Sequence, residues 1–147
     1  MNKQHEVELA WKGNLSFNIG VDEHLIVLDG VDENKGLCPK PLMLASLAGC
    51  TAIDVANILK ETRAQFEKFE IRVVGELSKE KPQTYTKVHV SYNFTGKDLD
   101  EKKLRDAVSL SIDEQCGVWM MFEKFAEMSY EIKFKSPIPN SKKQKTT

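Results

Sequence analysis

The sequence has few cysteines, almost no net charge and no histidine cluster, and each shortage excludes a class of protein. Three cysteines among 147 residues are too few, and too irregularly spaced, for the disulfide framework of a small secreted domain. The formal net charge is −1 and basic residues alternate with acidic ones, so no basic stripe exists to attract nucleic acid. The three histidines are scattered without ligand spacing, and we expect no metal site.

Motifs for cofactors and for a secretory signal are also missing. The chain has no glycine-rich phosphate loop, no Rossmann fingerprint and no Gly-x-Ser-x-Gly turn, so we expect no bound cofactor. The first six residues are polar and lead directly into an alternating pattern instead of the apolar segment of a signal peptide. Together with the unpaired cysteine count, this predicts a cytoplasmic protein in a reducing compartment.

Hydrophobic residues make up 41% of the chain and charged residues 29%, which is the balance of one soluble globular domain.

Near the N-terminus, residues 6–12, 15–19 and 25–28 have the alternating or short apolar patterns of β-strands. The turn-forming pairs Gly13-Asn14 and Asp29-Gly30 bound these runs. We therefore expect a three-stranded meander before a loop of about residues 30–40.

The most informative segment is the apolar run 42–59, which Pro41 opens and which we expect to end near Gln65. Proline suits the first turn of a helix, where its missing N–H has no partner anyway. The run is apolar on nearly every side, which predicts a buried helix. A membrane span is the alternative, but Asp54 and Asn57 within the run argue against it.

The rest of the chain predicts a strand pair, two helices and a last strand. The expected ranges are 69–77 and 88–94 for the strands, 100–110 and 117–122 for the helices, and 128–134 for the last strand. Asp98 or Asp100 is expected to cap the first of these helices, and Ser111 to begin a new segment. Because strands and helices are segregated along the chain, α+β is the expected class. We expect one domain, 1–136, and a disordered polar tail, 137–147.

Cys50 lies in the middle of the predicted central helix, between the small residues Gly49 and Thr51. Asp54 is four residues further on, hence on the same face one turn away. A carboxylate on an otherwise apolar helix needs a hydrogen-bond partner or a water-filled site. Buried cysteines are usually inert, however, and these residues alone favour Cys50 as a small core residue.

The other two cysteines have weaker signals. Cys116 lies at a predicted helix start, where the helix dipole favours thiolate, while Asp113 and Glu114 just before it oppose ionisation. A partly buried small residue is an equally good interpretation. Cys38 precedes Pro39 in a predicted loop, and we expect an exposed thiol without a special role.

Two segments resemble the cysteine motifs of the OsmC/Ohr family. Residues 44–55, which surround Cys50, look like its first-cysteine helix, and residues 108–111 followed by Cys116 look like its second-cysteine segment. Residues 74–76 and 90–96 also match the family pattern. The likeness extends from about Trp11 to Phe134, nearly the whole chain before the tail.

The resemblance implies an antiparallel sheet of about six strands around a buried central helix, in an intertwined homodimer with a site at each subunit interface. It also implies a thiol-dependent organic hydroperoxide reductase for oxidative-stress defence. In such an enzyme Cys50 attacks the peroxide as thiolate and becomes a sulfenic acid. Cys116 then condenses with it to a disulfide, and a dithiol reductant regenerates both thiols. Neither nucleic acid nor a membrane is an expected partner.

The chain departs from the best peroxidases of that family near the first cysteine. Those enzymes carry an arginine in the N-terminal strands and a glutamate before the cysteine helix. Here no arginine precedes Arg63, and Lys40-Pro41 stands where the acidic residue is expected. Lys12 can supply a positive charge but not the bidentate geometry of arginine. Two alternatives therefore stay open: a non-catalytic dimer that binds a small apolar ligand in the interface cleft, and a purely structural dimer.

Overall fold

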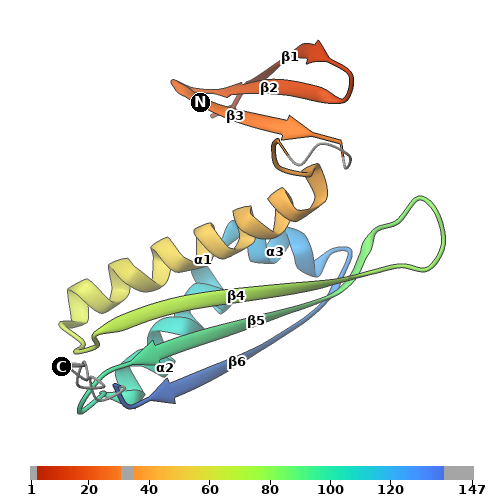
Figure 1. Cartoon of the computed structure of the whole chain (residues 1–147). Helices are drawn as coiled ribbons and strands as arrows, with labels where there is room; N and C mark the ends of the chain where they lie inside the picture. The colour runs from red at the N-terminus through yellow and green to blue at the C-terminus, as the bar shows by residue number, and fades with distance from the viewer. Residues whose placement is uncertain (1–2, 31–34, 138–147) are drawn as a thin grey trace, which may run out of the picture. The chain divides into compact units, whose positions relative to one another are not determined.

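The computed structural model describes residues 3–30 and 35–137, which divide into two compact units, 1–45 and 46–147 (Figure 1). Apart from its first residue, the predicted tail lies outside the described residues. The described residues contain six strands, as the sequence predicts, but the expected single antiparallel sheet is wrong, because the strands form two sheets of three.

The first unit is the predicted meander, formed by β1 (Val7–Gly13), β2 (Ser16–Val21) and β3 (His24–Asp29). The turn between β1 and β2 contains Gly13 and Asn14, whose φ angles of 114° and 48° are positive. Glycine and asparagine tolerate this region best, which explains why the chain reverses here. The indole Nε1 of Trp11 donates to the Asn14 carbonyl over 2.9 Å and closes the turn.

Helix α1 extends over Pro39–Thr62, so it begins two residues before the expected start and ends three residues before the expected end. Arg63 follows with a φ of 53°, a left-handed conformation that stops the helix. Within the second unit its buried residues lie on one face: Leu47, Thr51, Val55, Ile58 and Leu59. The expectation of a helix buried on nearly every side is not met in the single chain, where Ile53 is 64% exposed.

Helix α1 is long and apolar enough to cross a membrane. Length and composition alone do not distinguish a membrane span from the core helix of a soluble protein, which has the same properties. The buried face of α1 is occupied by this protein's own residues. Thr51 shares hydrogen bonds with Tyr92 and Ser111, and Leu47 and Val55 are fully buried within the chain. We therefore interpret α1 as a core helix of this chain.

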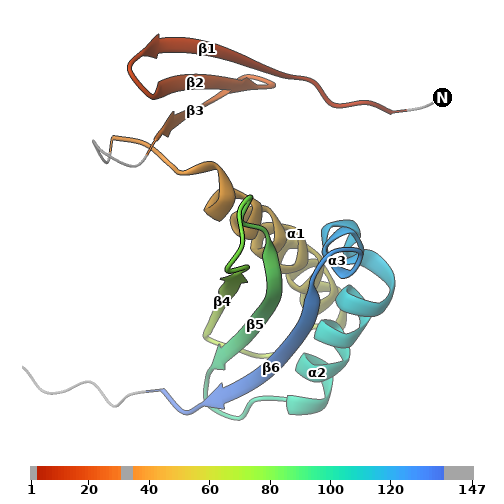
Figure 2. The ribbon, with the colours of Figure 1, turned by 90° about the vertical axis from the view of Figure 1, so that its right-hand side faces the viewer.

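The second unit is a three-stranded sheet whose one face is covered by helices (Figures 1 and 2). The strands are β4 (Lys68–Leu77), β5 (Tyr85–Thr95) and β6 (Glu127–Lys135), and between β5 and β6 come α2 (Glu101–Leu110), the π-helical turn η1 (Ser111–Gln115) and α3 (Gly117–Glu123). Strand β5 pairs antiparallel with β4 but parallel with β6. The helical crossover explains this departure from the expected antiparallel order, because it returns the chain to the end of the sheet where β5 begins.

The core of this unit follows the predicted alternation. Val88, Val90, Tyr92 and Phe94, the predicted apolar face of β5, are all buried, and the Phe94 ring stacks on Phe69 with centroids 4.7 Å apart.

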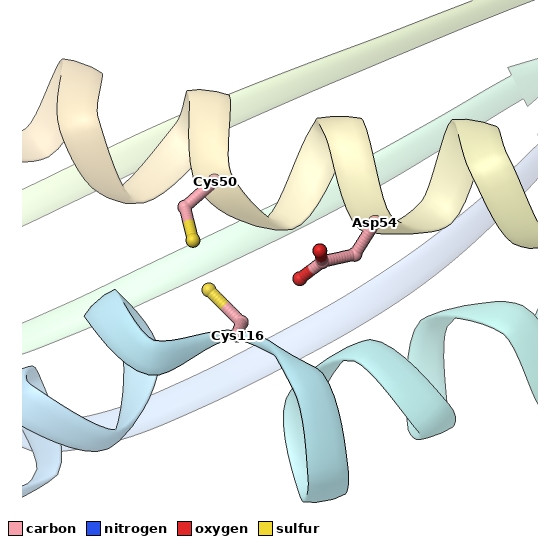
Figure 3. A group of neighbouring side chains, drawn as sticks. All are labelled: Cys50, Asp54 and Cys116. Atoms are coloured by element: carbon pink, nitrogen blue, oxygen red, sulfur yellow. The ribbon is translucent and has the colours of Figure 1, made fainter. Parts of the chain in front are cut away.

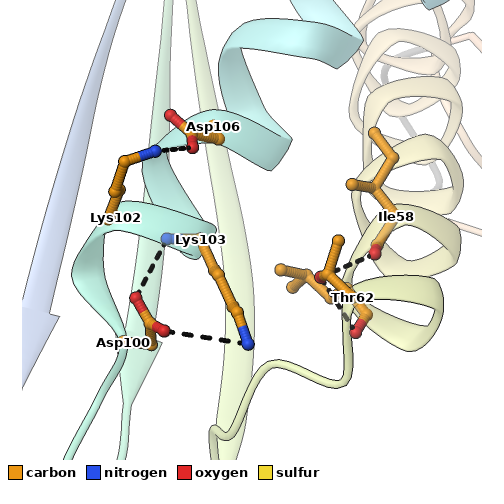
Figure 4. Close-up of polar contacts among 7 residues, drawn as sticks. Ile58, Thr62, Asp100, Lys102, Lys103 and Asp106 are labelled. Carbon is orange, nitrogen blue, oxygen red and sulfur yellow. Dashed lines mark hydrogen bonds and ion pairs between the residues drawn. The ribbon is translucent and has the colours of Figure 1, made fainter.

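Helix α2 begins at the predicted cap. Asp100 accepts a hydrogen bond from the backbone N–H of Lys103 over 3.2 Å and also pairs with its ammonium group (Figure 4). On the helix surface Lys102 and Asp106 form an exposed ion pair one turn apart. At the end of α1, the Thr62 hydroxyl donates to the Ile58 carbonyl over 2.9 Å. The Asp100 contact thus marks the start of α2, and the Thr62 contact marks the end of α1.

Candidate functional site

Cys50, Asp54 and Cys116 meet between α1 and the junction of η1 with α3 (Figure 3). The two sulfurs and a carboxylate oxygen of Asp54 all lie within 4.8 Å of one another. The three side chains point toward one another, two from successive turns of α1 and one from the facing segment. Both cysteines are free thiols in this structure. The fold thus brings together the two cysteines that the sequence singled out and the carboxylate one turn from the first.

The π-helical turn η1 aims Cys116 at α1. The backbone N–H of Cys116 donates to the Ser111 carbonyl over 2.7 Å, the wide-turn bond that closes η1. Cys116 then leaves helical geometry, with φ −78° and ψ 98°, and caps α3. Its sulfur accepts from the backbone N–H of Trp119 over 3.4 Å. Inserted π-turns are frequent at functional sites because they redirect one side chain without breaking the helix.

A buried hydrogen-bond chain holds Asp54 in place. The Thr51 hydroxyl shares hydrogen bonds of 2.8 Å with the Tyr92 hydroxyl and 2.9 Å with the Ser111 hydroxyl. Ser111 in turn donates to Asp54 Oδ2 over 3.3 Å. Thr51, Tyr92 and Ser111 are fully buried, so the chain orients the carboxylate from inside the core.

Sequence analysis assigned no role at the site to Thr51, Tyr92 or Ser111. The first lies on the buried face of the apolar helix 42–59 and the second on the inward face of the predicted strand 88–94. A hydroxyl at a core position needs a buried hydrogen-bond partner, so these positions indicate that a buried polar contact exists. The sequence does not show which hydroxyls bond to one another, because the three residues lie on three separate elements.

The site disfavours the ionised form of Cys116. Burial raises the pKa of this thiol, the hydrogen bond from the Trp119 backbone lowers it, and the neighbouring Cys50 and Asp54 raise it further. Burial likewise raises the pKa of Tyr92 to about 12. Cys116 is fully buried whereas Cys50 is half-buried. Of the two cysteines, Cys50 is therefore the more exposed residue.

Alkaline pH is expected to destabilise the reduced protein. The folded pKa values of Cys116 and Tyr92 lie above the unfolded values of about 8.5 and 10, so the folded state keeps protons that the unfolded chain releases. This stability is fully present below pH of about 8.5 and is lost as pH rises toward the folded pKa values. Denaturant unfolding at increasing pH should show a falling free energy of unfolding, and Tyr92→Phe together with Cys116→Ser should flatten the fall. A double variant with the wild-type slope would contradict this.

Cys38 takes no part in this arrangement as described. It belongs to the first unit, is half-buried and directs its sulfur to the Asp29 carbonyl at 3.8 Å. The expectation of an exposed loop thiol is therefore met only in part. As a free thiol outside the group of Cys50, Asp54 and Cys116, it is a matched control for experiments on that cysteine pair.

Comparison with known proteins identifies related chains. The family model described as OsmC-like protein matches residues 32–131. Protein YhfA of Escherichia coli strain K12 is 31% identical over 130 residues, which cover 86% of this chain and 97% of YhfA.

Solved structures share the fold over almost their whole length. A hypothetical protein from Aquifex aeolicus superposes with a TM-score of 0.77 at 30% identity, covering 90% of this chain and 98% of that one. The organic hydroperoxide resistance protein OhrB of Bacillus subtilis superposes with a TM-score of 0.63 at 21% identity, covering 88% and 98%. At that identity the second likeness concerns the fold alone.

Proposed function

The chain belongs to the OsmC-like protein family, and from this premise we propose that it is a cytoplasmic, thiol-dependent hydroperoxide reductase with Cys50 and Cys116 as its redox pair. The observation that carries the proposal is the convergence of both sulfurs and the Asp54 carboxylate within 4.8 Å. Free cysteines in a protein core are usually inert and solitary, so two facing thiols beside a carboxylate favour redox chemistry.

In the first step Cys50 attacks the peroxide. Asp54 accepts the thiol proton, and the Cys50 sulfur forms a bond to the terminal peroxide oxygen while the O–O bond breaks. The departing alkoxide takes the proton back from Asp54 and leaves as an alcohol. Cys50 is then a sulfenic acid, oxidised by two electrons, and the hydroperoxide has been reduced by the same two. The Ser111 hydroxyl supports the carboxylate throughout.

In the second step Cys116 resolves the sulfenic acid. Its sulfur attacks the Cys50 sulfur, the S–O bond breaks, and the Cys116 proton leaves with the hydroxyl as water. The sulfurs start within 4.8 Å, so small side-chain movements bring them to the bonding distance of about 2 Å. The raised pKa of Cys116 keeps it a thiol until this step, which protects it from direct oxidation. A dithiol reductant restores both thiols by exchange.

The apolar surroundings of the pair support an organic substrate. Trp119, three residues after Cys116, is buried and packs edge-on against Tyr130, with ring centroids 6.1 Å apart. Met120 and Met121 next to it are exposed apolar side chains. An alkyl or aryl hydroperoxide gains apolar burial there that hydrogen peroxide cannot gain.

The active form is proposed to be a homodimer. Apolar side chains on both units remain exposed in the single chain, among them Trp11 at 69% and Ile53 at 64%. Leu9 on the same strand as Trp11 is exposed as well. Exposed apolar side chains that recur along one strand favour coverage by a partner, and a second copy of this chain is the partner that the family resemblance predicts.

Steady-state kinetics test the function. With a dithiol reductant present, the reduced protein should consume cumene hydroperoxide faster than hydrogen peroxide, and the rate should scale with protein concentration. Cys38→Ser serves as the matched control and should keep the wild-type rate. No turnover of either peroxide with any dithiol would reject the reductase.

A second candidate is a non-catalytic dimer that binds a small apolar ligand. It is favoured by the charge of the site, since none of the ion pairs found among residues 3–30 and 35–137 involves Asp54, and a thiolate beside it gains no cation there. In that case Cys50 should react slowly with iodoacetamide near pH 7. An apolar ligand should then raise the melting temperature by mass action.

A further inference from the structure

The two thiols and the carboxylate also make a set of metal ligands. Cys50, Cys116 and Asp54 each offer one ligand atom, and these atoms lie within 4.8 Å of one another. Around one Zn²⁺ ion, tetrahedral ligands of these types are separated by roughly 3.5–3.8 Å. Side-chain adjustments of about one ångström or less per ligand therefore close the observed triangle around an ion. Three protein ligands leave the fourth tetrahedral position to water.

Neighbouring groups hold the three ligand side chains in place through hydrogen bonds. The Ser111 hydroxyl donates to Asp54 Oδ2, and Thr51 in turn orients Ser111. The backbone N–H of Trp119 donates to the Cys116 sulfur, a contact that stabilises a thiolate ligand. Such outer contacts fix the orientation of ligands and strengthen metal binding.

The negative charge of the site also favours a bound cation. Two thiolates and a carboxylate bring three negative charges together. No ion pair found among residues 3–30 and 35–137 gives Asp54 a cationic partner. Thiolates are soft ligands, which favour Zn²⁺ and its heavier analogue Cd²⁺ over Mg²⁺ or Ca²⁺. The expectation of no metal site relied on spacing along the chain, and the fold brings together ligands that are distant in sequence.

We propose that the reduced protein binds one thiophilic divalent cation of the Zn²⁺ class through Cys50, Cys116 and Asp54, and that the bound cation blocks attack on peroxides. Binding forms two metal–sulfur bonds and one metal–oxygen bond and releases the two thiol protons to solvent. The cation and the peroxide compete for the same Cys50 lone pair. The disulfide form has no thiolate to offer, so the oxidised protein does not bind the cation at this site. The inference concerns ligand geometry and does not need the reductase activity.

Competition with a chromophoric zinc chelator tests the site on the full-length reduced protein. The expected result is one Zn²⁺ per chain, with affinity lowered at least about 100-fold in Cys50→Ser and in Cys116→Ser, because each removes a thiolate ligand. Asp54→Asn should lower it by about 10–100-fold. Cys38→Ser should bind as the wild type does. With Cd²⁺, the ultraviolet thiolate-to-metal charge-transfer band should appear in wild type and Cys38→Ser and disappear in both other serine variants.

The inference would be overturned by wild type without a bound ion at micromolar Zn²⁺, by binding that Cys38→Ser abolishes, or by equal affinity in wild type and Asp54→Asn. The disulfide form of the wild type gives a second measurement that needs no variant, and zinc binding by it as tight as by the reduced form would also overturn it. Peroxide reactions run with excess chelator report the reductase separately. Disulfide formation there without any zinc affinity would reject only the metal site, and zinc affinity without disulfide formation would reject only the reductase.

Discussion

Cys50→Ser is expected to lower the rate of peroxide reduction by on the order of 10³-fold or more, since removal of a nucleophile eliminates the covalent step. A serine hydroxyl is not oxidised by a hydroperoxide under these conditions and cannot form the sulfenic acid. The position is half-buried on α1 and the replacement is nearly isosteric, so the fold should persist. Peroxide consumption per chain, measured with cumene hydroperoxide and a dithiol, gives the result.

Cys38→Ser is the matched control for this loss, because it removes a thiol from the first unit and leaves Cys50 and Cys116 intact. It should retain the wild-type rate within about twofold, as expected for a residue with no part in the reaction. The assignment of Cys50 as nucleophile would be wrong if Cys50→Ser stayed active while Cys38→Ser lost activity.

Cys116→Ser should consume one equivalent of peroxide at the wild-type rate and then lose turnover by about 100-fold or more, because no thiol remains to resolve the Cys50 sulfenic acid. With excess peroxide the trapped sulfenic acid should advance to sulfinic acid, visible by mass spectrometry as a second added oxygen on Cys50. The first oxidation should proceed at a rate near that of wild type. This separates loss of resolution from loss of the nucleophile.

The serine introduced at position 116 should still cap α3, since its hydroxyl oxygen can accept the hydrogen bond from Trp119 that the sulfur accepts now. Circular dichroism and the thermal midpoint provide the check on folding. Unchanged steady-state turnover in a folded Cys116→Ser variant would contradict a two-cysteine mechanism and point to direct reduction of the sulfenic acid.

Local patterns in the sequence predicted the elements that depend on neighbouring residues. The alternation in 88–94 predicted the buried face of β5, and Asp100 was one of the two candidates for the cap of α2. The meander 7–29 followed from alternation and from the turn at Gly13-Asn14. In each case the determinant is a period of two residues or a side chain that bonds its own backbone a few residues away.

Features that depend on distant residues could not be derived from these patterns. The parallel pairing of β6 depends on where the α2–α3 crossover returns the chain, and no local period encodes that. The π-turn η1 ends where Cys116 leaves helical geometry toward α1, and no local pattern in the sequence indicates such a turn. No local pattern predicts that Cys50 and Cys116 lie next to each other, and only the family resemblance indicated it.

Asp54 is the residue that most distinguishes this site from a pair of facing thiols. The sequence placed it one turn from Cys50, and the structure adds that both sulfurs lie within 4.8 Å and that Ser111 supports its carboxylate. Its proposed roles as proton carrier in the reductase and as ligand for a cation use the same oxygens. They therefore exclude each other at any one moment, which makes cation binding inhibitory.

The proposed chemistry depends on disulfide formation between Cys50 and Cys116 in response to a hydroperoxide, and mass analysis of the wild type detects that bond without any variant. Reduced protein with chelator present is treated with one equivalent of cumene hydroperoxide, quenched with an alkylating agent and digested. We expect rapid loss of two hydrogen atoms and a peptide pair joined through Cys50 and Cys116. A protein that stays reduced for many minutes, or that oxidises only at Cys38, would contradict it.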